Sequence, residues 1–116
     1  MAKRKRPRRE MPAAATVDYT DSEGNVLTLR QSLSPGTIRK IGEPPGRAAA
    51  TLEDAWARRE ELLFERLAVR WEISGLPLTD QAMLLGRYRM ADAEMQRWVR
   101  ETIATHLQRH IPELAQ

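Results

Sequence analysis

Two histidines near the end of the chain have a spacing that could bind a metal. His106 and His110 are four residues apart, so in a helix they lie on one face, where they could bind zinc with a third ligand such as Glu113. The zinc-protease signature also requires a glutamate directly after the first histidine, and Leu107 stands there. We therefore predict no metal site. The alternative is two partly buried imidazoles at a helix C-terminus, where the helix dipole favours their protonated form.

The other residues of catalytic type do not form a recognisable set. The 116 residues include no cysteine, and they contain no glycine-rich phosphate loop and no G-x-S-x-G motif. Most carboxylates stand three or four residues from an arginine, as Asp54 does from Arg58, which is typical of ion pairs on an exposed helix. We predict a protein that is not an enzyme and that uses no cofactor and no small-molecule substrate.

Three tryptophans could stack on bases or sugars. Trp56, Trp71 and Trp98 occur at helical spacing among aliphatic residues. This pattern favours packing in a core or at a subunit interface.

A block of positive charge opens the sequence. Six basic residues and Glu10 give residues 1–10 a net charge of +5, whereas the other 13 basic and 15 acidic residues sum to −2. A cationic segment of this kind can bind phosphates, attract an acidic protein or aid solubility. The candidate polyanion-binding residues are Lys3, Arg4, Lys5, Arg6, Arg8 and Arg9.

Pattern changes divide the chain into three segments. Residues 1–15 show no apolar periodicity, and we expect a disordered basic tail. Residues 16–50 contain two alternating runs around "DSEGN", which predict a β-hairpin, then a short helix capped by Ser34 and a Pro/Gly linker. Residues 51–116 have helical periodicity.

Stop signals within residues 51–116 predict about three helices. The first is expected over residues 52–74, with Thr51 as its N-cap and with Gly75 and Pro77 at its end. The second is expected to begin after Thr79. Asp92 caps a third helix, or the second and third are continuous with a bend, and Pro112 closes the last. The predicted fold class is mainly α: a small helical bundle preceded by a short β-hairpin and a disordered basic tail.

The predicted helix over residues 52–74 has a wide apolar stripe, which indicates burial on two sides. Either the rest of the chain covers this stripe, or a partner protein does. The candidate protein-interaction residues are Leu63, Phe64, Leu67 and Trp71.

The layout resembles that of tail assembly chaperones of actinobacterial long-tailed phages and prophages. The resemblance rests on the hairpin "DSEGNVLTLR" and on the helical segment that begins "DAWARREELLFERLAVRW". It implies a phage protein that binds tape-measure and tail-tube proteins during virion assembly and shields their apolar helical segments. It transfers no functional residue to this chain.

Other interpretations remain open. The chain could be a nucleic-acid-associated protein that acts through its basic tail, a minor structural protein of the virion, or a self-associating protein. No apolar run approaches the ~20 residues that span a membrane, and the basic start lacks the apolar stretch of a secretory signal. We therefore expect a cytoplasmic protein with no membrane partner.

Overall fold

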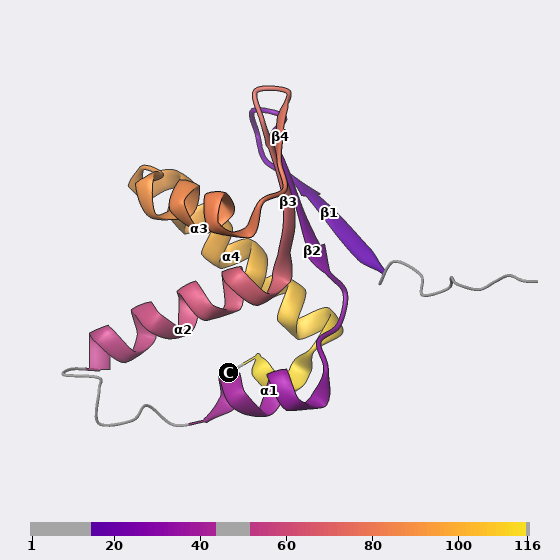
Figure 1. Ribbon diagram of the computed structural model, residues 1–116, viewed down its shortest axis with the longest axis vertical. Helices are drawn as coiled ribbons and strands as arrows, with labels where there is room; N and C mark the ends of the chain where they lie inside the picture. Colours follow the sequence, from indigo (N-terminus) through magenta and orange to yellow (C-terminus); the bar gives the residue numbers. More distant parts are fainter. Residues whose placement is uncertain (1–14, 44–51, 116) are drawn as a thin grey trace, which may run out of the picture.

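A four-stranded antiparallel sheet forms one layer of the computed structural model, which describes residues 15–43 and 52–115 (Figure 1). Its strands are β1 (Thr16–Thr20), β2 (Val26–Arg30), β3 (Ala68–Ile73) and β4 (Leu76–Leu78), and they lie side by side in that order. The β1–β2 hairpin confirms the predicted one. The β2–β3 ladder joins segments about forty residues apart in sequence, with an irregularity between Thr28 and Leu29.

The second layer is helical. Within the described residues it comprises α1 (Pro35–Gly42), α2 (Leu52–Leu67), α3 (Gln81–Met90) and α4 (Ala93–His110), followed by the 3-10 turn η2 (Pro112–Leu114). Figure 1 shows the C-terminal turn beside α1 and the first half of α2 projecting away from the sheet.

Side-chain caps set three of the helix starts. Ser34 accepts a hydrogen bond from the Thr37 backbone N–H, and Asp92 accepts one from that of Met95, so both predicted caps are confirmed. The second helix of the C-terminal half was expected to be capped by Thr79. The cap is instead Asp80, whose carboxylate accepts from the Met83 backbone N–H.

The predicted mainly helical bundle is wrong, because the chain folds as a mixed α/β structure. The helix expected to reach residue 74 ends at Leu67, and the chain continues directly into β3. Val69, Trp71 and Ile73 alternate along this strand, and β-branched and aromatic residues suit a pleated sheet. The apparent widening of the apolar stripe was thus a change from helical to strand periodicity.

Each hairpin turn uses residues that tolerate positive φ. Gly24 has φ 87° in the β1–β2 turn, and the Ser74–Gly75 turn between β3 and β4 has φ values of 53° and 80°. Two successive positive φ angles match a type I′ hairpin turn. The two turns are also linked, since the Asn25 side-chain oxygen accepts a hydrogen bond from the Ser74 backbone N–H at 3.0 Å.

Gly75→Ala should lower the free energy of unfolding by about 1–2 kcal/mol, because an L-residue is strained at positive φ. The matched control is Gly36→Ala in α1, where an added Cβ has no atom within 4 Å and no positive φ is required. The control should be neutral or slightly stabilising, since alanine favours helix. Urea denaturation of both variants measures the difference, and equal midpoints would contradict the turn assignment.

The core lies between the sheet and the helices. Leu27, Leu29 and Trp71 are fully buried on the sheet face that the helices cover. The opposite face is polar: Thr28 donates a hydrogen bond to Asp18, and Arg70 pairs with Glu72 at 2.7 Å. The remaining buried apolar residues are Ile41, Leu63, Phe64, Leu67, Ala68, Leu84, Tyr88, Val99, Ile103, Leu107, Ile111 and Leu114.

Candidate functional site

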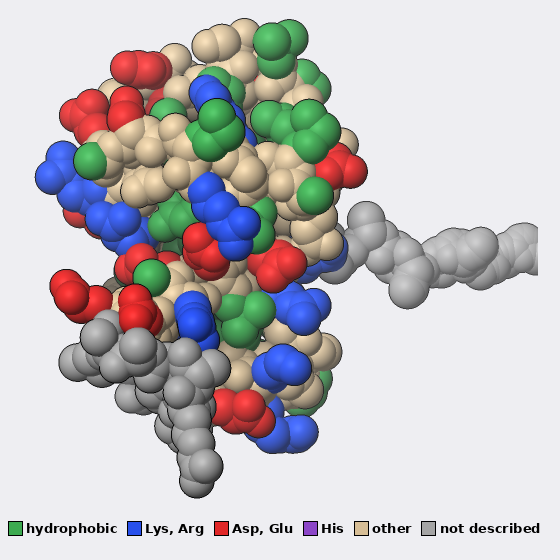
Figure 2. Space-filling view, turned by 60° about the vertical axis from the view of Figure 1, so that its left-hand side comes forward, with side chains coloured by type: hydrophobic (Ala, Val, Ile, Leu, Met, Phe, Trp, Pro, Cys, Tyr) green, Lys and Arg blue, Asp and Glu red, His purple; other side chains and the backbone are tan. Residues whose placement is uncertain are grey.

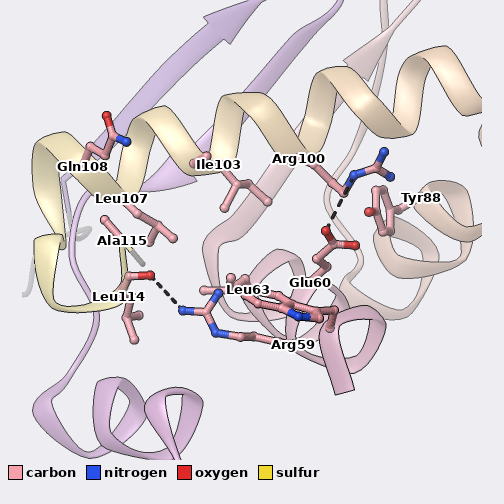
Figure 3. Close-up of a pocket in the computed structure, with 12 residues that line it drawn as sticks. Arg59, Glu60, Leu63, Tyr88, Arg100, Ile103, Leu107, Gln108, Leu114 and Ala115 are labelled. Carbon is pink, nitrogen blue, oxygen red and sulfur yellow. Dashed lines mark hydrogen bonds and ion pairs between the residues drawn. The ribbon is translucent and has the colours of Figure 1, made fainter. Parts of the chain in front are cut away.

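A groove of about 230 Å³ lies between α2, α4 and the C-terminal turn η2 (Figure 3). Its floor is apolar and comes from three elements: Leu63 from α2, Ile103 and Leu107 from α4, and Leu114 from η2. Ile103 and Leu107 are four residues apart, so they lie on the same face of α4. Packing of these side chains forms the floor but leaves the space above it open.

An exposed aromatic and an arginine form one side of the groove. Trp56, in the projecting half of α2, is 48% exposed. The Arg59 guanidinium lies 5.9 Å from the centre of its ring, within the range of a cation–π contact. The same guanidinium donates a hydrogen bond to the Leu114 carbonyl at 2.8 Å and so joins α2 to the C-terminal turn (Figure 3). Arg59 is thereby held beside Trp56 at the groove mouth.

The other side of the groove is polar. A carboxylate oxygen of Glu60 lies 3.6 Å from Nε of Arg100, which connects α2 with α4 across the groove. Tyr88 lies beside this pair. Burial raises the pKa of its phenol, and a hydrogen bond with Arg100 partly offsets this rise. With Arg59, Glu60 and Arg100 at its rim, the groove carries a net charge of about +1.

The four predicted protein-interaction residues lie in the core and not on the surface. Leu63 is 4% exposed, and Phe64, Leu67 and Trp71 are 0% exposed. Phe64 stacks on Tyr88 with ring centres 4.9 Å apart and meets Trp71 edge-on at 5.7 Å. Only Leu63 of the four lines the groove, as part of its floor. These four side chains are therefore covered by the chain's own sheet and helices.

The predicted polyanion-binding residues, Lys3 to Arg9, lie outside the described residues. The expected disordered tail of residues 1–15 falls there too, except for Ala15, and so does most of the expected linker before residue 51.

The two histidines have different surroundings. His106 is fully buried: its Nδ1 lies 2.7 Å from the Tyr19 hydroxyl, and its Nε2 lies 2.8 Å from the Arg30 carbonyl. Because a carbonyl only accepts, Nε2 carries the proton, and Nδ1 accepts from Tyr19. The His110 ring lies 4.8 Å from the His106 ring.

The expected protonation of His106 is wrong. Burial lowers the pKa of its imidazole, the neighbouring His110 lowers it further, and the hydrogen bond to Arg30 opposes them. Desolvation thus outweighs the helix dipole. Among the described residues, no group of three or more His, Cys, Asp or Glu could hold a metal ion.

The groove was not predicted from the sequence. One signal was available, since Trp56 and Arg59 are three residues apart on a helix and so can touch. The Glu60–Arg100 pair had no such signal, because its partners are forty residues apart.

Comparisons of the chain with protein-family models, with curated proteins and with solved structures found no match. Within residues 15–43 and 52–115, no helix is both long enough and apolar enough to cross a membrane.

Proposed function

We propose that this chain is a non-enzymatic protein-interaction module that holds an apolar segment of a partner protein in the groove between α2, α4 and η2. The observation that carries this proposal is Trp56, a large aromatic left half-exposed above an apolar floor. Exposed tryptophan with neighbouring tyrosine and arginine is the composition of protein-binding hot spots. Trp56, Arg59 and Arg100 supply tryptophan and arginine at the rim, and the buried Tyr88 also lines the groove.

The size of the groove favours a protein partner over a small molecule. Ligand pockets usually enclose about 300–1,000 Å³, whereas this groove has about 230 Å³. Such a space suits one or two large apolar side chains that project from a partner segment. The net positive rim favours a segment with an acidic residue beside its apolar anchor.

The resemblance to tail assembly chaperones gives this proposal a specific form. In that role the chain would bind a tape-measure or tail-tube protein in the host cytoplasm during phage assembly and would leave before the particle is complete. The contact residues differ from those expected from sequence. Trp56, Arg59 and Arg100 replace Phe64, Leu67 and Trp71, because only the former lie at the surface of the groove.

Trp56→Ala should weaken binding of the partner segment by about tenfold or more, as expected for a hot-spot aromatic. The measurement is a binding titration between the purified chain and a purified tape-measure or tail-tube protein. Leu76→Ala is the matched control, since Leu76 is an apolar side chain that is 73% exposed and lies outside the groove. The control should bind like the unchanged chain.

Three results would contradict the proposal. The first is that neither tail protein binds the unchanged chain. The second is that Trp56→Ala binds normally while deletion of residues 1–14 abolishes a salt-sensitive interaction, which would indicate polyanion binding through the basic segment. The third is that the chain remains in finished particles, which would indicate a structural component of the virion.

A further inference from the structure

The two arginines at the groove rim are held in different ways. The Arg59 guanidinium is fixed by the Leu114 carbonyl at 2.8 Å and lies 5.9 Å from the centre of the Trp56 ring. The Glu60 carboxylate lies 3.6 Å from Nε of Arg100. That distance is longer than an ordinary N–H···O hydrogen bond. The chain itself therefore occupies Arg59, whereas its ion pair with Arg100 is loose.

A second ion pair of α2 shows what a close contact looks like in this fold. Glu61 accepts hydrogen bonds from Nε and from a terminal amino group of Arg89, at 3.0 and 2.8 Å. The Glu60–Arg100 pair is longer, and each of its side chains is 39% exposed. An exposed ion pair of this kind contributes little free energy. Another carboxylate can therefore replace Glu60 beside Arg100.

Arg100 has hydrogen-bond donors to offer to such a carboxylate. Figure 3 shows its Nε turned toward Glu60, with the two terminal amino groups on the other side of the guanidinium, near Tyr88. Arg100 hydrogen-bonds to the Tyr88 hydroxyl, but a guanidinium carries five N–H donors. Donors thus remain for a carboxylate from outside the chain, with which arginine forms short, charge-assisted hydrogen bonds.

The wider surface gives no other source for a preference between acidic and basic partners. On the face that Figure 2 shows, basic and acidic side chains are interspersed. Mixed charge of this kind produces little long-range field. We therefore expect any preference for an acid to come from an individual guanidinium at the groove.

We infer that Arg100 recognises a carboxylate next to the apolar anchor of the bound segment, and that Glu60 competes with this carboxylate for the same guanidinium. The inference rests on the proposed function, since it assigns the acidic residue expected in the partner to one position of the groove. In the free chain Glu60 stays beside Arg100. When an acidic segment binds, its carboxylate takes the place of Glu60, which turns to solvent.

Two capped tripeptides that differ in one group test this inference. One contains phenylalanine, glutamate and leucine, and the other has glutamine in place of glutamate. Each is titrated into the isotope-labelled full chain up to about 10 mM. The readout is the shift of the backbone amide NMR signals of Ala104 and Gln108, which line the groove. The acidic peptide should bind about fivefold more tightly, as expected for one partly exposed charge pair.

Substitutions at the ion pair should have opposite effects. Arg100→Gln should bind the two peptides equally, because the acid has lost its partner. Glu60→Gln should increase the preference for the acidic peptide by about twofold, because the competing carboxylate is gone. The matched controls are Arg97→Gln and Glu101→Gln, which remove the same charges at exposed positions of α4 outside the groove. Both should keep the preference of the unchanged chain, and melting curves should confirm that every variant is folded.

The possible results distinguish this inference from the proposed function. If both peptides shift the signals of Ala104 and Gln108 with equal affinity, the groove binds apolar segments without recognising an acid, and only the inference is overturned. It is also overturned if Arg100→Gln keeps the preference, or if Glu60→Gln leaves the preference unchanged. If neither peptide shifts these signals, the groove holds no apolar segment, and the proposed function fails together with the inference.

Discussion

Replacing Phe64 with alanine should lower the free energy of unfolding by about 3–5 kcal/mol, the usual cost of deleting a fully buried aromatic. Phe64 is 0% exposed, and it contacts the rings of Tyr88 and Trp71 on two sides. These residues come from α2, α3 and β3, so the deletion would leave a cavity where three elements meet. Chemical denaturation followed by far-UV circular dichroism measures the loss, and a domain of ordinary stability would lose much of its margin.

The control for this experiment is Trp56→Ala on the same helix. Trp56 is half-exposed, so its removal should cost less than about 1 kcal/mol. The two variants distinguish a core residue from a contact residue, which the sequence pattern could not do. Loss of a core residue lowers stability, whereas loss of a groove residue weakens binding. If Phe64→Ala left stability unchanged and weakened partner binding, Phe64 would be a contact residue and the core assignment would fail.

Stability should also fall as the pH is lowered below about 6.5, because His106 is buried in its neutral form. The folded-state pKa of His106 lies below its ordinary value of 6.5. Between these two pKa values the unfolded chain binds a proton that the folded chain does not. The stability contributed by the neutral imidazole is thus fully present above pH 6.5 and is lost as the pH falls toward the folded-state pKa.

In this pH window, uptake of one proton by the unfolded chain can change the free energy of unfolding by at most about 1.4 kcal/mol for each pH unit. Three other groups lie near the imidazole. The Tyr19 hydroxyl is hydrogen-bonded to it and does not ionise between pH 5.5 and 7.5, because burial raises the pKa of Tyr19. The His110 ring lies beside it, and Arg109 is close enough to lower the pKa of Tyr19. Protonation of His106 would also turn Nδ1 from acceptor into donor toward Tyr19.

Urea denaturation at pH 5.5, 6.5 and 7.5 tests this expectation. His106→Gln removes the titrating imidazole and should reduce the dependence of the free energy of unfolding on pH. All other ionisable groups are the same in the variant and the unchanged chain, so the difference between the two reports on His106. His110→Gln is the matched control and should retain most of the slope. An unchanged slope in His106→Gln would show that other groups cause the acid sensitivity.

Local signals predicted several elements correctly. The turn formers at residues 21–25 and the alternating runs beside them gave the first hairpin, and Ser34 and Asp92 cap helices as expected. Val99, Ile103 and Leu107, which are buried on α4, also recur at the spacing of one helix face. In each case the residues that determine the structure are neighbours in sequence.

The segment from Leu67 to Ile73 shows where such signals failed. Its apolar residues fit both a helix and a strand, because a short run can match either period. Pairing with β2 decided the outcome, since Leu27 lies opposite Trp71 in the antiparallel ladder. That partner is forty-four residues away, and no local pattern identifies it.

The sequence by itself determined the first hairpin with its Gly24 turn, the caps Ser34 and Asp92, and the absence of thiol chemistry, because each depends on residue type or on neighbours a few positions apart. Only the tertiary structure decided the β3–β4 hairpin, the neutral His106 and the groove. Arg59 meets Leu114, Glu60 meets Arg100, and His106 meets Tyr19 across long stretches of chain. Such contacts depend on how the helices pack on the sheet, and the spacing of residues along the chain does not specify that packing.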